Sequence, residues 1–186
     1  MVVRRRLMTA EELLRLPDDG MRHELIDGEL RTMAPPGGAH GDSAGSIHGH
    51  LSRFVYDQPI ARILAEAGFI LRRNPDRVRA PDVAVLSIDR IPAEGIPNGY
   101  IAGAPDLAIE VVSPNDRATE IRDKVADWLL AGARVVWVVY TSPVRLFVHR
   151  ADGTVEQLGP DDEVDGGDVL PDFRMRVADL LYPFRR

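Results

Sequence analysis

The sequence predicts a mixed α/β (α+β) fold, in which helices flank a mixed central sheet within one domain spanning residues 1–186. Three observations support this prediction. Segments with the apolar spacing of helices alternate with β-branched runs typical of strands. One helical segment connects two apolar runs, and such a crossover makes its two strands parallel neighbours in a sheet. Turn-forming pairs join adjacent short runs near both ends of the chain, which indicates antiparallel hairpins.

The first third of the chain predicts a short helix, a hairpin and a longer helix. Residues 9–16, TAEELLRL, form the short helix, with Thr9 as the N-cap of a capping box. Asp-Gly separates two short runs within residues 23–33, HELIDGELRTM, and predicts the hairpin. The Pro- and Gly-rich residues 34–41 predict a loop, and residues 42–58 have the apolar spacing of the longer helix.

The rest of the chain predicts further strands around a second long helix. That helix is expected to begin through Ser113 and Pro114 and to run over residues 117–132. It connects the central strand to the next one, and a turn at Ser142-Pro143 leads to another. We expect all of these strands to share one sheet. The predicted strands are residues 68–73, 80–87, 106–113, 134–141 and 144–150.

Three remaining segments complete the prediction. Residues 91–105 are rich in Pro and Gly, which predicts a surface loop. The acidic residues 159–168, GPDDEVDGGD, predict a solvated turn. Residues 168–181 predict a strand and a short helix that pack on the domain.

Composition limits the class of protein. The chain has no cysteine, which excludes disulfides and thiolate metal sites and fits a reducing compartment. We find no signal peptide and no apolar run long enough to span a membrane, so we expect a cytoplasmic protein with no membrane partner. The formal net charge of -6 argues against a protein that coats nucleic acid without specificity. A local basic groove remains compatible with it, with Arg4–Arg6 and residues 70–79, ILRRNPDRVR, as candidates.

Glu110 is a carboxylate inside the apolar central strand, and its burial has to be compensated. Because alternate strand residues share a face, Glu110 lies on the same face as the small Ala108. Asp82 stands beside the small Ala84 in the same way. If the two strands pair, the carboxylates can converge on Mg²⁺, which takes one or two carboxylates, waters and phosphate oxygens. The other interpretation is that Asp82 only caps a strand end.

Lys124 is the second unusual residue, because arginine fills the other 22 of the 23 basic positions. Coding bias alone explains an arginine-rich chain, but a retained lysine also suits a place where a guanidinium fails. Lys124 lies at the edge of the apolar stripe of its helix, four residues before Trp128. From there its side chain could reach the Glu110 face. The alternative is a surface lysine whose stem covers apolar neighbours.

The order and spacing of these segments resemble the Uma2 family, formerly a domain of unknown function. The resemblance rests on HELIDGEL, APDVAVLS, EVVSPND, Lys124 and WLLAGARVVWVVY, and it runs from about Leu7 to Leu181. Members of the family are placed in the PD-(D/E)XK restriction-endonuclease-like superfamily. The resemblance therefore implies a restriction-endonuclease-like core for the predicted fold.

The resemblance also implies a metal site. The Pro-Asp motif of the superfamily matches the dipeptide that ends at Asp82, and the superfamily's acidic residue matches Glu110. Asp82, Glu110 and the backbone carbonyl of Val111 would then bind Mg²⁺ or Mn²⁺. The superfamily lysine would fall at Val112, but in this family it stands in the next helix, at Lys124. Lys124 would orient the attacking water or stabilise charge on the phosphate.

Two further residues follow from the resemblance, and a few positions depart from it. Glu24 resembles the N-terminal acid of the superfamily and would hold a second ion or a water on the metal. His40 matches a recurrent histidine after the Pro/Gly loop. None of the departures removes an expected metal ligand, and Trp128 is expected to be a core residue. The departures are Val135-Val136 in place of Glu-Tyr, Tyr140 in place of aspartate, and Trp128 in place of tyrosine.

These features lead us to expect a metal-dependent endonuclease that hydrolyses phosphodiester bonds of DNA. A homodimer is expected, because one small domain carries one site and duplex cleavage needs two cuts. The alternative is a catalytically inactive nuclease-fold protein that binds nucleic acid or protein, and the net acidity with Val135 and Tyr140 favours it. A third hypothesis is a metal-free hydrolase, for example of sugars, with Asp82 and Glu110 as acid and base.

Overall fold

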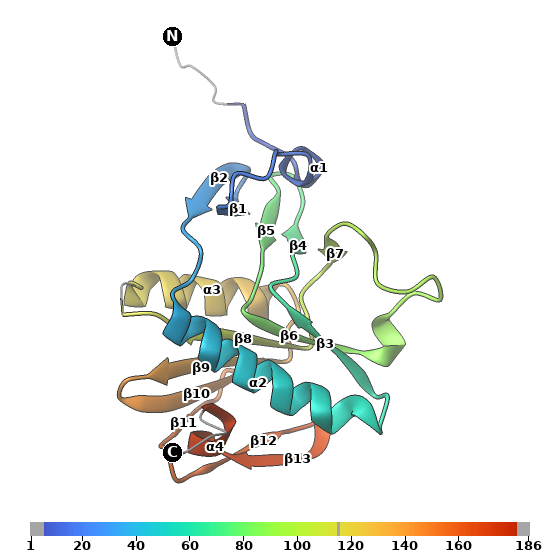
Figure 1. The fold of residues 1–186 in the computed structure, drawn as a ribbon. Helices are drawn as coiled ribbons and strands as arrows, with labels where there is room; N and C mark the ends of the chain where they lie inside the picture. Colours follow the sequence, from blue (N-terminus) through green and yellow to red (C-terminus); the bar gives the residue numbers. More distant parts are fainter. Residues whose placement is uncertain (1–5, 115, 182–186) are drawn as a thin grey trace.

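The computed structural model describes residues 6–114 and 116–181 and has the mixed α/β architecture predicted from the sequence (Figure 1). In this part of the chain the strands form sheets of six, five and two strands, whereas the sequence predicted one sheet. Figure 1 shows the six-stranded sheet in the middle of the molecule, between the other two. None of the described helices is long and apolar enough to cross a bilayer.

The six-stranded sheet contains the central strand predicted from the sequence. In order across the sheet, its strands are β11 (Val155–Leu158), β10 (Val144–Arg150), β9 (Val135–Thr141), β8 (Leu107–Val112), β6 (Val83–Ser87) and β3 (Ala61–Ala65). Strands β8 and β9 are parallel, which confirms the prediction made from the helical crossover. Strands β6 and β8 pair antiparallel, with Ala84 opposite Ala108. The two strands that carry the candidate carboxylates are therefore neighbours.

The five-stranded sheet contains the predicted N-terminal hairpin. In order, its strands are β2 (Glu29–Met33), β1 (Arg22–Ile26), β5 (Arg77–Arg79), β4 (Phe69–Arg72) and β7 (Ile101–Ala102). Asp27 and Gly28 form the hairpin turn with φ values of 56° and 77°, the left-handed pair that suits the twist of a two-residue turn. The single-sheet prediction was wrong because β5 and β7 are too short to show a period, and β7 lies in the segment expected to be a loop.

The helices cover both faces of the six-stranded sheet (Figure 1). The helices that do so are α2 (Gly38–Tyr56), α3 (Ala118–Leu130) and α4 (Val177–Leu181), whereas α1 (Ala10–Leu14) packs on the five-stranded sheet, and a 3₁₀ turn spans Ile88–Arg90. Helix α2 buries Ile47 and Leu51 in a cluster with Ile109 of β8. Helix α3 buries Val125 and Trp128 in a second cluster with Ala108 of the same strand. The alternation of side chains along β8 thus divides the core into two layers.

Helix boundaries differ from the predictions at two places. Helix α2 begins at Gly38, inside the segment predicted as a loop, and its first turn carries His40, which lies 2.9 Å from Asp82. We attribute the early start to this tertiary contact, which outweighs the low helix propensity of glycine. Helix α3 has Arg117 as its N-cap, so the predicted entry at Ser113 and Pro114 was wrong. The capping box of α1 at Thr9 is confirmed.

The acidic segment 159–168 is not only a turn. Residues Glu163–Gly166 form β12, which pairs with β13 (Leu170–Arg176) in the two-stranded sheet. Val164 is buried at 1% exposure, and this one apolar residue anchors the strand to the core cluster of α4. The prediction of a solvated turn was wrong because charged residues dominate the segment and conceal a strand whose alternate positions are buried.

Candidate active site

Glu110 lies in the middle of β8 with 2% of its surface exposed, and both of its carboxylate oxygens accept hydrogen bonds from α3. Lys124 donates from Nζ to Oε2 at 2.7 Å, and Trp128 donates from Nε1 to Oε1 at 2.8 Å. Lys124 and Trp128 lie one turn apart on the same side of α3, so each can donate to a different oxygen of the Glu110 carboxylate. Burial raises the pKa of Glu110, and the charge of Lys124 opposes that rise.

Lys124 is a cation in this arrangement. Burial lowers its pKa, but the charges of Glu110 and Glu24 outweigh burial, and the pKa of Lys124 is raised overall. The ammonium therefore stays protonated at neutral pH. The contact with buried Glu110 argues against the alternative of a surface lysine whose stem only covers apolar neighbours. The raised pKa makes Lys124 a source of positive charge instead of a general base.

Asp82 is the second buried carboxylate and directly precedes β6. Its Oδ2 accepts a hydrogen bond from the backbone N–H of Val111 at 2.7 Å, which ties it to the residue after Glu110. Continuing the β6–β8 register, in which Val83 is opposite Ile109, places Asp82 opposite Glu110 on the same face. The negative charge of Asp82 also acts to raise the pKa of Glu110. The strand pairing on which the predicted convergence depends is thus present, and shared binding of a cation by the two carboxylates stays a prediction.

His40 and Arg22 face Asp82 from other elements. His40 Nε2 lies 2.9 Å from Asp82 Oδ1, although not at the angle of a hydrogen bond, and Arg22 Nη1 lies 3.5 Å from the same oxygen. His40 Nδ1 is 3.1 Å from Oγ of Ser113. Contact with Asp82 raises the pKa of His40. Burial acts to raise the pKa of Asp82, but His40 and the Val111 N–H outweigh burial and lower it.

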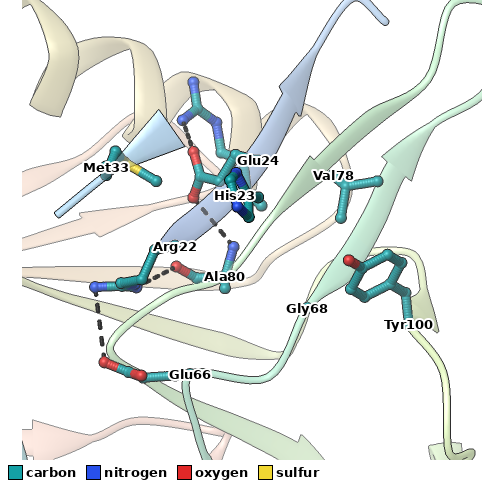
Figure 2. A pocket seen from close by; sticks show the side chains of 10 residues that line it. Arg22, His23, Glu24, Met33, Glu66, Gly68, Val78, Ala80 and Tyr100 are labelled. Atoms are coloured by element: carbon teal, nitrogen blue, oxygen red, sulfur yellow. Dashed lines mark hydrogen bonds and ion pairs between the residues drawn. The ribbon is translucent and has the colours of Figure 1, made fainter. Parts of the chain in front are cut away.

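Glu24 lies in β1 with its carboxylate directed at other protein groups (Figure 2). Its Oε2 accepts from Arg79 Nη1 at 2.8 Å, and its Oε1 accepts from the backbone N–H of Ala80 at 3.2 Å. The charge of Glu24 is therefore compensated by Arg79, while it still helps to raise the pKa of Lys124. Glu24 is near the candidate site, but both of its carboxylate oxygens bind residues 79 and 80, which connects β1 to the end of β5. The sequence did not indicate this structural role.

Asp127 is a buried residue that the sequence analysis did not single out. It lies on α3 between Lys124 and Trp128, and Arg79 Nε donates to its Oδ2 at 2.6 Å. Arg77 forms an ion pair with the other oxygen. Spacing of three and four residues from Lys124 puts Asp127 and Trp128 on one side of the helix, and this was the available signal. The ion pairs of Asp127 with Arg77 and Arg79 connect β5 of the five-stranded sheet to α3, the helix that donates hydrogen bonds to Glu110.

The candidate basic patch in residues 70–79 is neutralised within the protein. Each of its four arginines contacts at least one carboxylate, so the segment offers little free positive charge to a phosphate backbone. Arg6 also pairs with Glu12, whereas Arg4 and Arg5 lie outside the described residues. The ion pairs of the segment are Arg72 with Asp27, Arg73 with Glu11 and Asp76, Arg77 with Asp27 and Asp127, and Arg79 with Glu24 and Asp127.

The chemistry of the site fits a hard divalent cation. Asp82 and Glu110 supply carboxylate oxygens from adjacent strands, and Mg²⁺ takes one or two carboxylates, with waters and substrate oxygens as its other ligands. Over residues 6–114 and 116–181, no group of three or more His, Asp or Glu side chains is arranged to hold a metal by itself. The described side chains therefore do not form a closed structural metal site, and a divalent cation at Asp82 and Glu110 stays a prediction.

Comparisons with protein families and with solved structures both give matches. A family model described as "Uma2: Putative restriction endonuclease" matches residues 10–178. The crystal structure of a putative nuclease belonging to DUF820 from Anabaena variabilis ATCC 29413 is similar, with a TM-score of 0.82 and 25% sequence identity. That similarity covers 94% of this chain and 97% of the other. No curated protein matches. The family model and this crystal structure support a nuclease-like function.

Proposed function

The chain belongs to the Uma2 family, and from this premise we propose that it is a metal-dependent endonuclease that hydrolyses phosphodiester bonds of DNA. One observation carries the proposal. Asp82 is buried directly before β6 and Glu110 is buried in the adjacent β8, and the one lysine of the chain donates a hydrogen bond to Glu110 at 2.7 Å. Two buried carboxylates that can share a divalent cation, beside a fixed ammonium, form a site in which a phosphate would be bound through the cation and its charge stabilised.

The side chains divide the work in this proposal. Asp82, Glu110 and the backbone carbonyl of Val111 would hold Mg²⁺ or Mn²⁺. When bound, such an ion polarises the scissile phosphate and lowers the pKa of the attacking water. Lys124, protonated at neutral pH, stabilises the negative charge that develops on the phosphate oxygens. Trp128 holds the carboxylate of Glu110 in one orientation through its indole N–H.

A binding protein without catalytic activity is the second candidate function. The ion pairs of the four arginines in residues 70–79 favour it, because a nuclease needs positive charge to hold the phosphate backbone. The metal-free sugar hydrolase is disfavoured by the contact between Glu110 and Lys124, since a general acid must carry its own proton. Cleavage that resists EDTA would revive that third hypothesis.

The deciding experiment is cleavage of supercoiled plasmid and of single-stranded DNA with Mg²⁺ or Mn²⁺. Wild type would be compared with Glu110→Gln and Lys124→Arg, with EDTA as a chemical control. Glu163→Gln is the matched control, because Glu163 is an exposed glutamate that also contacts a basic side chain, Arg174. We expect metal-dependent cleavage that is lost in both site variants and kept in the control. Absence of cleavage by wild type on every substrate, with Mn²⁺ bound through Glu110, would assign the binding function instead.

The homodimer is part of the same proposal, since a duplex has two strands to cut. Light scattering on the purified protein would measure its mass. A dimer is expected to convert supercoiled plasmid to the linear form with little nicked intermediate, whereas a monomer would accumulate the nicked circle. A monomeric mass at the concentration used for cleavage would contradict this part.

A further inference from the structure

A pocket of about 210 Å³ lies beside the candidate active site and plays no part in the proposed hydrolysis (Figure 2). In Figure 2, Arg22 and Glu66 lie on one side of it and Tyr100 on the other, with Glu24 between them. Met33 closes a further part of the wall. The pocket therefore combines an aromatic ring and a thioether with several charged side chains.

The charges around the pocket cancel. Arg22 and Arg79 supply two positive charges, and Glu24 and Glu66 supply two negative charges. A pocket for phosphate would need an excess of positive charge, because charge-assisted bonds from arginine or lysine provide its affinity. A pocket with no net charge suits a neutral ligand that has hydrogen-bond donors and acceptors around its edge, and a nucleobase is such a ligand.

Tyr100 is placed as a flat surface for such a ligand. Its ring lies on the backbone of Gly68, where an added Cβ would come within 2.3 Å of the ring. Among the described residues no hydrogen bond is found for the Tyr100 hydroxyl. Burial raises the pKa of Tyr100, which keeps the hydroxyl protonated and able to donate. Aromatic rings stack on any base, and a thioether adds a polarisable contact.

Arg22 connects the pocket to the candidate site. It lines the pocket, and its Nη1 lies 3.5 Å from Asp82 Oδ1 and 3.7 Å from Glu66 Oε1. The Glu24–Arg79 ion pair lines both this pocket and a second one that Lys124 lines. One side chain, Arg22, thus lines the pocket and also contacts Asp82, which places the pocket next to the candidate site.

We propose that this pocket binds one nucleobase of a DNA strand, next to the phosphate that is cleaved. The inference rests on the proposed nuclease function and adds to it the part of the substrate that is recognised. Within a duplex the base would have to leave the stack, which costs a few kcal/mol and is easier at mismatched or single-stranded positions. Single-stranded or distorted DNA would therefore bind more tightly than regular duplex.

A short oligonucleotide tests the pocket without requiring cleavage. The probe is a thymidine trinucleotide with 2-aminopurine at the centre, bound in the presence of Ca²⁺, with fluorescence as the readout. Wild type would be compared with Tyr100→Leu, which keeps apolar volume but removes the ring, and with Tyr100→Phe. Tyr56→Leu is the matched control, because Tyr56 is 84% exposed at the end of α2. Ala80→Leu would fill the pocket by an independent route.

We expect wild type to quench the probe and Tyr100→Leu to bind it about tenfold more weakly, the effect of losing one stacked base. Tyr100→Phe and Tyr56→Leu should bind as wild type does, and Ala80→Leu should bind weakly. If wild type and Tyr100→Leu are both folded and quench the probe equally, the proposal that this pocket binds a nucleobase is wrong. Binding of free 2-aminopurine deoxyriboside as tightly as the trinucleotide would overturn recognition of a strand in favour of a small-molecule ligand.

The plasmid assay on the same preparations separates this inference from the proposed function. If wild type and Tyr100→Leu cleave the plasmid equally and quench the probe equally, the nucleobase pocket is rejected and the nuclease function is retained. Quenching that depends on Tyr100 without any cleavage would support the pocket and reject hydrolysis.

Discussion

Arg79 and Asp127 are joined by a buried hydrogen bond of 2.6 Å although they are 48 residues apart in the chain. Arg79 belongs to β5 of the five-stranded sheet, and Asp127 belongs to α3, which covers the six-stranded sheet. Asp127 also lies on the helix between Lys124 and Trp128, the two residues that hold Glu110. This ion pair therefore determines how the helix is positioned above the carboxylates.

Asp127→Asn should lower the free energy of unfolding by about 3 kcal/mol, because it removes the charge that compensates two partly or fully buried arginines. Urea unfolding followed by tryptophan fluorescence measures the change. Glu163→Gln serves as the control, since an exposed pair contributes little and should change stability by less than about 0.5 kcal/mol. Equal effects of the two substitutions would show that the buried pair is not a stabilising contact.

Trp128→Phe should weaken Mn²⁺ binding about 10- to 100-fold, because Glu110 loses the donor that orients its Oε1. Isothermal titration calorimetry with Mn²⁺ measures the affinity. Trp137→Phe is the matched control, as Trp137 is equally buried but lies in the core cluster on the other side of the sheet. A similar loss in both variants would indicate general loosening of the core.

His40 should make stability depend on pH in the metal-free protein. Its folded pKa is raised by Asp82, so its contribution to stability is complete below the unfolded pKa of about 6.5 and is lost as pH rises through the folded value. The difference in unfolding free energy between wild type and His40→Gln should therefore shrink between about pH 5.5 and about pH 8.5. Urea titrations at both pH values measure it. If the difference in unfolding free energy between wild type and His40→Gln grows with pH, the pKa of His40 is lowered by folding and the prediction is wrong.

Glycine substitutions should separate two kinds of position. Gly49→Ala on the exposed face of α2 should stabilise the protein by up to about 1 kcal/mol, because a Cβ there meets nothing within 4 Å and alanine favours helix. Gly68→Ala should destabilise it by about 1–3 kcal/mol, because the new Cβ collides with the Tyr100 ring. Thermal unfolding of both variants measures the effects. Stabilisation by Gly68→Ala would mean that the ring can move aside freely.

The parts of the fold that the sequence predicted well are those with a long period or a local signal. The capping box at Thr9, the Asp27-Gly28 turn and the parallel pairing of β8 with β9 are all confirmed. The division into separate sheets was not predictable, because it depends on the pairing of β5 with β1 and of β7 with β4, which are distant from each other in sequence. Residues 38–41 were missed for a related reason, since a contact between His40 and Asp82 offsets the poor propensity of the segment.

Residue pattern also located the candidate site only in part. The carboxylates Asp82 and Glu110 stood out because a charge in an apolar strand is costly. Trp128 was expected to be a core residue, and it is buried, but its indole N–H bonds to Glu110, which no periodicity reveals. Asp127 resembled any charged helix residue, because its arginine partners come from β5, on the far side of a long connection.

The ion pairs around Asp127 also have a consequence for biosynthesis. A ribosome releases the chain from its N-terminus, so Arg77 and Arg79 emerge before Asp127 exists to receive them. The early hairpin has only Asp27 and Glu24 to offer these arginines until α3 is translated. A truncated translation product ending before α3 would have an incompletely neutralised sheet and no Lys124. Such nascent fragments are expected to be substrates for chaperones and proteases, because the two arginines gain their remaining carboxylate only when α3 docks.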